Sequence, residues 1–169
     1  MNHYRPYLYG AYGSNLNTKQ MGFRCPKAHR LGTVMLKDWR LTFRGVADIE
    51  QHAGSEVPIA LWRITKECEQ SLDRYEGFPN LYGKSFVSLD NQLMMRTYES
   101  VIGMMKDGLL TTGLSLMPEI MLYSMVDDDH VYPPSDPYLD SIIQGYEDFE
   151  LPKQHLKDAV MLSYTDETA

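Results

Sequence analysis

Residues 57–64, with the sequence VPIALWRI, form the strongest strand pattern in the chain and indicate its fold class. Successive side chains of a β-strand point to opposite faces of the sheet. The two faces predicted for this strand hold Val57, Ile59, Leu61 and Arg63 on one side and Ala60, Trp62 and Ile64 on the other. Because both faces are largely apolar, we expect a central strand that is packed on both sides.

Other strands and helices are expected on both sides of this segment. Strands are predicted at residues 7–12, within 31–44, at 86–89 and at 120–126. Helices are predicted after an Asn17 cap, from a Thr65 cap to Glu76, from Pro137 after an Asp136 cap, and at about residues 155–162. Since strands outnumber helices and the two are not regularly interleaved, the pattern favours the α+β class over a doubly wound parallel sheet.

Length and composition limit the classes of protein to consider. A chain of 169 residues has the size of one domain, at roughly 150 residues per domain. Its net charge of −7 argues against nucleic-acid binding, because that affinity comes from basic residues. The first residues, MNHYRPYLYG, lack a signal-peptide pattern, no apolar run is long enough to span a bilayer, and two cysteines are too few for a disulfide framework. We therefore expect a cytoplasmic protein without a membrane segment.

Residues 9–16, with the sequence YGAYGSNL, contain the first feature that is suited to chemistry. A strand that breaks at Gly-Ser-Asn before a helix points several backbone N–H groups into one space. The start of the helix adds partial positive charge, so this loop is suited to an anion such as a carboxylate. The alternative is an ordinary strand-to-helix turn, in which glycine and asparagine only satisfy the backbone geometry.

Glu76 is the second such feature, because it lies beside the face of its helix that is predicted to be buried. That face is formed by Cys68, Leu72 and Tyr75. Glu76 projects about 40° from it and lies in the last turn, where the helix dipole is negative. Both conditions disfavour the charged carboxylate, so we expect a raised pKa, as a general base near neutral pH requires. The alternative is a boundary glutamate that pairs with an arginine such as Arg63 or Arg74.

Two tyrosines are further candidates for a pocket, and no metal site is predicted. Residues 133–138, PPSDPY, begin a helix rigidly and place Tyr138 near its start, while Tyr82 follows soon after Glu76. The alternative for each tyrosine is a core or rim position. The five histidines are scattered, neither cysteine has surroundings that would activate a thiol, and no phosphate-binding or nucleotide-binding motif occurs. We expect neither a metal ion nor a cofactor.

Three motifs together resemble the γ-glutamylcyclotransferase family, including its AIG2-like relatives. YLYGAYGSNL, at residues 7–16, resembles the family's N-terminal Y-G-S-N-L loop. LDRYEGFPNLY, at residues 72–82, resembles the stretch in which a tyrosine follows Glu-Gly. PPSDPYLDSIIQGYEDFELP, at residues 133–152, resembles the C-terminal P-S-x-x-Y helix and its closing Leu-Pro. The motifs follow one another in the family's order.

The resemblance implies a fold and a set of site residues. The implied fold is a small mixed β-barrel flanked by helices, with a ligand cavity at its mouth, in a single domain over residues 1–169. Glu76 is implied as the catalytic carboxylate. The residues implied for substrate binding are Tyr9, Gly10, Ala11, Tyr12, Gly13, Ser14, Asn15, Leu16, Tyr82 and Tyr138. Residues 91–118 are longer than the family's usual link between strands, so we expect an insertion there.

The activity implied by the resemblance is an intramolecular acyl transfer on a small γ-glutamyl substrate. The α-amino group attacks its own γ-carbonyl, so that 5-oxoproline forms and an amine or amino acid leaves, with Glu76 as general acid and base. One alternative is a non-catalytic module that binds a γ-glutamyl group or 5-oxoproline. Another is a cyclotransferase that acts on γ-glutamylamines or removes a γ-glutamyl protecting group. The sequence leaves open whether the protein is a monomer or a homodimer.

Overall fold

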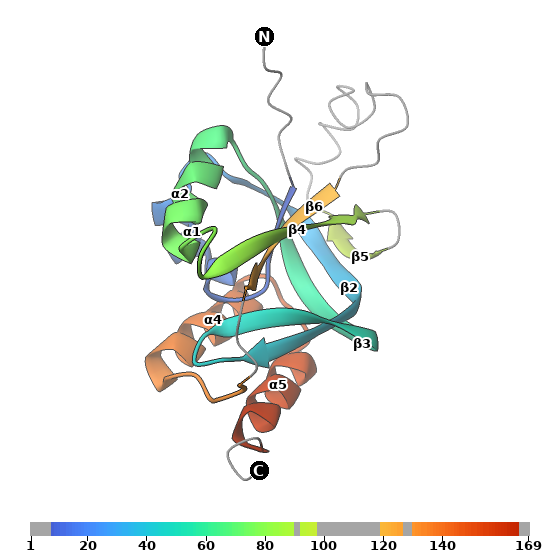
Figure 1. Cartoon of the computed structure of the whole chain (residues 1–169). Coiled ribbons are helices and arrows are strands. Elements are labelled where there is room, and N and C mark those ends of the chain that lie inside the picture. The colour runs from blue at the N-terminus through green and yellow to red at the C-terminus, as the bar shows by residue number, and fades with distance from the viewer. Residues whose placement is uncertain (1–7, 90–91, 98–118, 127–129, 166–169) are drawn as a thin grey trace.

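The fold is built on one mixed sheet (Figure 1). The computed structural model describes residues 8–89, 92–97, 119–126 and 130–165. The strands are β1 (Leu8–Ala11), β2 (His29–Phe43), β3 (Ala47–Arg63), β4 (Tyr82–Ser88), β5 (Leu93–Thr97) and β6 (Glu119–Met125), in the order β4-β6-β1-β3-β2-β5. β1 is parallel to β6, and the other neighbouring pairs are antiparallel. The sheet of the described residues has β4 and β5 at its two ends, so it is not a closed barrel.

Helices accompany this sheet, as the α+β class predicts. They are the 3₁₀ turn η1 (Ser14–Leu16), α1 (Thr18–Arg24), α2 (Lys66–Glu76), α4 (Asp136–Asp148) and α5 (Gln154–Thr165). In Figure 1, α1 and α2 lie together on one side of the sheet, α4 lies beside the lower part of the β2–β3 hairpin, and α5 lies beneath that hairpin. No helix in the part of the chain that the structure describes is long and apolar enough to cross a membrane.

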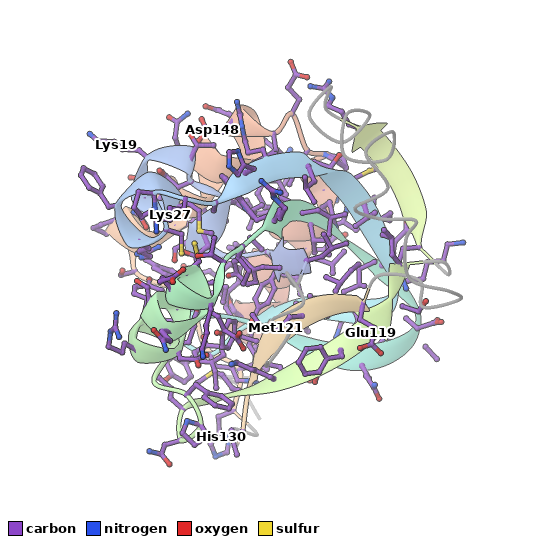
Figure 2. All side chains as sticks on the ribbon, turned by 90° about the horizontal axis from the view of Figure 1, so that it is seen from above. Lys19, Lys27, Glu119, Met121, His130 and Asp148 are labelled. Atoms are coloured by element: carbon purple, nitrogen blue, oxygen red, sulfur yellow. The ribbon has the colours of Figure 1, made fainter. Side chains whose placement is uncertain are left out.

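The VPIALWRI segment lies at the centre of the sheet, as predicted. It forms the second half of β3, which runs between β1 and β2. Val57, Ile59 and Leu61 are buried on one face, and Ala60 and Trp62 are buried on the other. Seen from above, Met121 of β6 also lies within the curve of the sheet, whereas Lys19 and Asp148 lie at the periphery (Figure 2). The core therefore lies on both faces of the central strands.

β2 and β3 form a long antiparallel hairpin that was only partly predicted. The pattern at residues 31–44 allowed one or two strands, and the structure has one, which continues through an irregularity at Asp38. Asp38 has a φ of 63°, in the left-handed region. Few residues besides glycine, asparagine and aspartate adopt this region readily. β3 begins at Ala47, well before the predicted strand, because its first half pairs with the end of β2. That polar half carries no core pattern of its own.

Local capping signals located the helices well. The Asn17 side chain accepts a hydrogen bond from the Gln20 N–H at 3.1 Å, and the Thr65 hydroxyl accepts one from the Cys68 N–H at 3.2 Å. Gly77 ends α2 with a φ of 64°. One predicted cap is wrong: α4 includes Asp136, and Ser135 precedes it as the N-cap residue. Pro137 lies in the first turn, as predicted.

The predicted insertion at residues 91–118 lies mostly outside the described residues. Its described part contains β5, which pairs antiparallel with β2 at one end of the sheet. The strand predicted at residues 86–89 belongs to β4, which begins earlier, at Tyr82. The strand predicted at 120–126 corresponds to β6, and the helix predicted at 155–162 corresponds to α5.

Gly145 is where α4 packs against the loop that follows β1. A Cβ atom at this position would lie 2.4 Å from the Leu16 Cβ and 2.7 Å from the Asn17 nitrogen. We expect Gly145→Ala to lower the free energy of unfolding by about 1–3 kcal/mol through overpacking, although alanine favours a helix. Chemical denaturation measures this change.

Gly22→Ala in α1 is the matched control, because no atom lies within 4 Å of its added Cβ. We expect this variant to be more stable than the wild type by about 0.5–1 kcal/mol. Equal effects of the two substitutions would contradict the close packing of α4 on the loop.

Candidate active site

A cavity of about 180 Å³ opens where the loop after β1 meets the end of α2. Eight of the predicted site residues line it: Tyr9, Tyr12, Gly13, Ser14, Asn15, Glu76, Tyr82 and Tyr138. They come from four segments of the chain, which the sheet and α4 bring together. The motifs at residues 7–16, 72–82 and 133–152 therefore meet in space.

Three predicted site residues lie outside the cavity lining. Gly10 lies within the sheet, where an added Cβ would come within 2.9 Å of the side chains of Leu122, Ile120 and Ile59. Ala11 and Leu16 are fully buried, and Leu16 packs on Gly145 of α4. These three residues pack closely beneath the loop and do not line the cavity, so the predicted contact of the loop with a ligand concerns its other five residues.

Glu76 is the last residue of α2, and its carboxylate faces the cavity. Burial raises the pKa of Glu76 to about 7, and the nearby positive charge of Arg24 opposes that rise. The rise in pKa has the direction that the sequence predicted. Neither Arg63 nor Arg74, the partners considered from the sequence, forms an ion pair with Glu76 within the described ranges. The half-buried carboxylate therefore has no ion-pair partner among the described residues.

The Asn15 carboxamide connects Glu76 to the loop. Its Nδ2 donates hydrogen bonds to the Tyr9 hydroxyl at 2.8 Å and to Glu76 Oε1 at 3.2 Å. Its Oδ1 accepts a hydrogen bond from Arg24 Nη1 at 2.6 Å. Asn15 is buried, and its bond to Tyr9 is buried with it, whereas its bonds to Glu76 and Arg24 are partly buried.

The loop also presents backbone donors. The first hydrogen bond of η1 runs from the Leu16 N–H to the Gly13 oxygen at 3.0 Å, and the next runs from Asn17 to Ser14. The N–H groups of Ser14 and Asn15 precede these bonds and are the first donors of the turn. That these two groups bind an anion stays a prediction from the sequence of the loop.

Tyrosines form most of the remaining wall of the cavity. Tyr82 donates a hydrogen bond to the Ala47 oxygen at 2.7 Å, and the Ala47 N–H donates one to the Tyr138 hydroxyl at 3.1 Å. The Tyr12 hydroxyl donates a hydrogen bond to the backbone oxygen of Tyr123 at 2.6 Å. Burial raises the pKa of Tyr138 to about 12 and also raises the pKa values of Tyr12, Tyr82 and Tyr123. All four therefore remain neutral phenols at physiological pH.

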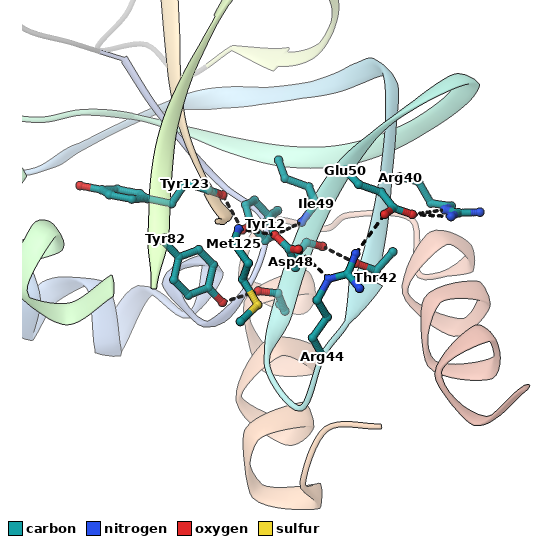
Figure 3. A network of polar contacts seen from close by, with 11 residues as sticks. Tyr12, Arg40, Thr42, Arg44, Asp48, Ile49, Glu50, Tyr82, Tyr123 and Met125 are labelled. Atoms are coloured by element: carbon teal, nitrogen blue, oxygen red, sulfur yellow. Dashed lines mark hydrogen bonds and ion pairs between the residues drawn. The ribbon is translucent and has the colours of Figure 1, made fainter. Parts of the chain in front are cut away.

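The turn between β2 and β3 forms the wall next to Tyr82 and Tyr138. Asp48, which is buried at 3% exposure, accepts a hydrogen bond from Arg44 Nε at 2.9 Å and another from the Met125 N–H at 2.9 Å. Arg44 also contacts Glu50 at 3.0 Å, and Glu50 pairs with Arg40 (Figure 3). This network attaches the hairpin to β6 and holds the position of the Ala47 backbone that the two tyrosines contact.

Sequence reasoning missed several residues of the site and misplaced one. Tyr123, Val46, Ala47 and Leu81 line the cavity, but a single strand or turn carries no signal for which face meets a ligand. Arg24 was missed as well, because its link to Asn15 depends on how α1 folds back on the loop. Tyr75 was predicted to be buried, yet it is 44% exposed. Its ring lies under Arg24, and its hydroxyl is 2.9 Å from Ser14 Oγ.

The sequence predicts neither a metal site nor a thiol nucleophile. Over the described ranges, no group of three or more His, Cys, Asp or Glu side chains is arranged to hold a metal ion. Cys25 and Cys68 are buried outside the cavity lining. Burial raises the pKa of Cys25 to about 12, so this thiol is protonated at neutral pH and is poorly suited to act as a nucleophile.

The raised pKa of Glu76 makes the stability of the folded protein depend on pH. In the unfolded chain this carboxyl has a pKa near 4.5, and in the folded protein its pKa is about 7. The folded state therefore binds more protons between these values, so stability falls as the pH rises through that range. We expect the stability of Glu76→Gln relative to the wild type to increase by about 3 kcal/mol from pH 4 to pH 8.

Urea denaturation at several pH values measures this difference. Glu147→Gln, which removes a carboxylate of the exposed surface of α4, is the control and should show no comparable pH dependence relative to the wild type. A stability difference for Glu76→Gln that is independent of pH would show that the Glu76 carboxylate is solvated.

The comparisons with known proteins agree with the fold. A solved γ-glutamyl cyclotransferase structure superposes with a TM-score of 0.67 over 90% of this chain and 85% of that chain, at 24% identity. YkqA from Bacillus subtilis superposes with a TM-score of 0.68 over 96% of this chain and 55% of that chain, at 17% identity. At these identities the likeness shows a shared fold.

Sequence comparison identifies the family. The chain is 32% identical over 117 residues to γ-glutamylcyclotransferase of Bos taurus and 37% identical over 83 residues to that of Mus musculus. These alignments cover 56% and 42% of this chain, and 62% and 44% of the relatives, so the chain spans about half the length of the curated relatives it matches. The family model described as "Gamma-glutamyl cyclotransferase, AIG2-like" matches residues 9–110, which is more than half of the chain. The chain belongs to the γ-glutamyl cyclotransferase, AIG2-like family.

Proposed function

We propose that this protein converts a γ-glutamyl amide into 5-oxoproline and releases an amine or amino acid, with Glu76 as general acid and base. The observation that carries the proposal is a carboxylate with a pKa of about 7 that lines a cavity together with the first residues of the η1 turn, Ser14 and Asn15. The curated relatives named γ-glutamylcyclotransferase support the same reaction.

The reaction needs a group that moves one proton. The α-amino nitrogen of the γ-glutamyl unit attacks its own γ-carbonyl carbon, which forms a C–N bond and closes a five-membered ring. The bond from that carbon to the leaving nitrogen then breaks. The proton lost by the α-amino group passes to Glu76 and from there to the leaving nitrogen, so Glu76 ends the cycle as it began.

The pKa of Glu76 decides how well it performs this step. An α-amino group has a pKa of about 8 and an unperturbed glutamate one of about 4.3, and this mismatch of roughly 3.5 units costs about 5 kcal/mol. Burial raises the pKa of Glu76 to about 7, which brings it close to that of the amine. Most of the energetic mismatch is thereby removed.

The loop and the tyrosines would position the substrate. In this proposal the N–H groups of Ser14 and Asn15 bind the α-carboxylate of the γ-glutamyl unit. The neutral phenols of Tyr82 and Tyr138 enclose the rest of the cavity and exclude water. Holding the amino group against the γ-carbonyl removes rotational freedom before the chemical step, which accelerates an intramolecular reaction.

The first test is release of 5-oxoproline from a γ-glutamyl dipeptide, ε-(γ-glutamyl)lysine and glutathione. We expect release from at least one of them by the wild type, and a kcat at least about 10²-fold lower for Glu76→Gln, because the general base is lost. Glu147→Gln should behave as the wild type. No release from any of the three, together with binding of 5-oxoproline, would instead identify a binding module.

The pH dependence tests the role of Glu76 separately. The base must be deprotonated to accept a proton, so kcat/KM for the active substrate should rise with pH through an apparent pKa of about 7. A rate that is constant between pH 5 and pH 8 would remove Glu76 from the proton transfer.

A further inference from the structure

We propose that Arg24 is a positioning residue for Glu76, because it holds the Asn15 carboxamide in the orientation that turns the amide nitrogen toward the carboxylate. The effect of Arg24 on turnover rests on the function proposed above. The effect of Arg24 on the pKa of the Glu76 carboxyl group can be measured whatever reaction the protein catalyses.

Arg24 is fixed in place at the end of α1. Its Nη1 donates to Asn15 Oδ1 at 2.6 Å and lies 3.4 Å from Ser14 Oγ, and its Nη2 donates to Gln20 Oε1 at 3.0 Å. The guanidinium also stacks on Tyr75, with its Cζ 3.6 Å from the ring centre. A planar group held by two separate acceptors and an aromatic ring keeps one orientation.

The direction of these hydrogen bonds determines how the amide lies. A guanidinium has only donors, so Arg24 donates to the oxygen of the Asn15 carboxamide and cannot form a hydrogen bond with its nitrogen. Nδ2 is then turned to the opposite side, where Glu76 Oε1 and the Tyr9 hydroxyl accept its hydrogen bonds. Without Arg24 the amide could rotate and place its oxygen against the carboxylate, which is an unfavourable contact.

Arg24 also differs in charge from the other groups around Glu76. The titratable groups that face Glu76 from neighbouring elements are phenols of β1, β4, β6, α4 and the loop after β1: Tyr9, Tyr82, Tyr123, Tyr138 and Tyr12. On α2 itself, Asp73 is paired with Lys84 and with the Tyr123 hydroxyl. Arg24 is the cation whose charge lowers the pKa of Glu76 against the effect of burial. Both its charge and its hold on Asn15 therefore favour the ionised carboxylate.

The test is a titration of the Glu76 side chain by ¹³C NMR in the wild type and in Arg24→Gln. We expect the pKa of Glu76 to rise by about one unit or more in the variant, because a cation and an oriented donor are both lost. The acid limb of kcat/KM should move to higher pH by the same amount, which lowers the rate below the limb by about tenfold.

Arg74→Gln is the matched control, since it removes the same charge from an exposed position on α2. Its Glu76 titration should follow that of the wild type. An unmoved Glu76 pKa in folded Arg24→Gln would overturn the proposal, as would equal shifts in the two variants. If the wild type releases no 5-oxoproline, the proposed function fails, and the NMR titration still decides the role of Arg24.

Two further variants separate charge from orientation. Arg24→Lys keeps the charge but lacks the planar pair of donors, so we expect a smaller shift in the same direction. If the Glu76 pKa and the kcat/KM of Arg24→Lys equal those of the wild type, the charge alone suffices, and the positioning role is overturned. In an Asn15→Ala background, Arg24→Gln should lower kcat/KM by a smaller factor than in the wild type, and equal factors would contradict action through Asn15.

Discussion

The hydrogen bonds of the Asn15 carboxamide hold the polar side of the cavity together. One end of the carboxamide bonds to Arg24 of α1, and the other end bonds to Tyr9 of β1 and Glu76 of α2. A buried carboxylate needs compensating donors, because desolvation disfavours its charge. Asn15 supplies one such donor without neutralising the group, and burial still raises the pKa of Glu76 to about 7. A direct ion pair with an arginine would favour the charged form more strongly and make a weaker base.

This arrangement is supported by the buried centre of the sheet. β1 is a short strand held between β3 and β6, and its residues are all buried. The loop that follows it is packed against Gly145 of α4, and the opposite wall is held by the Asp48–Arg44 pair. Desolvating Glu76 costs stability, and the hydrophobic core on both faces of the sheet offsets that cost. Such a local loss of stability is a common accompaniment of functional groups.

The accuracy of each sequence prediction follows the range of the interactions behind it. α2 was predicted with its cap and its end because Thr65 and Gly77 act within one turn of the helix. The central position of β3 followed from apolar residues on both of its faces. By contrast, Tyr75 is 44% exposed and its ring contacts Arg24, which is far from it in sequence, so helical periodicity alone misplaced it in the core. The family resemblance implies a barrel, but the term fits this chain only loosely, because the sheet of the described strands ends at β4 and β5 and does not close.

The sequence by itself determined the α+β class, the caps of α1 and α2 and the place of the Gly-Ser-Asn loop, because these depend on periodicity and on neighbours within a few residues. It also indicated the direction of the Glu76 pKa shift, although the burial that causes the shift comes from tertiary packing. Only the tertiary structure decided which residues of 9–16 face the cavity, and that Tyr123 and Ala47 join them. It also decided that Arg24 rather than Arg63 or Arg74 acts on Glu76. The physical reason is that these contacts join segments whose separation in the chain carries no local signal. They exist only once the sheet and α4 bring those segments together.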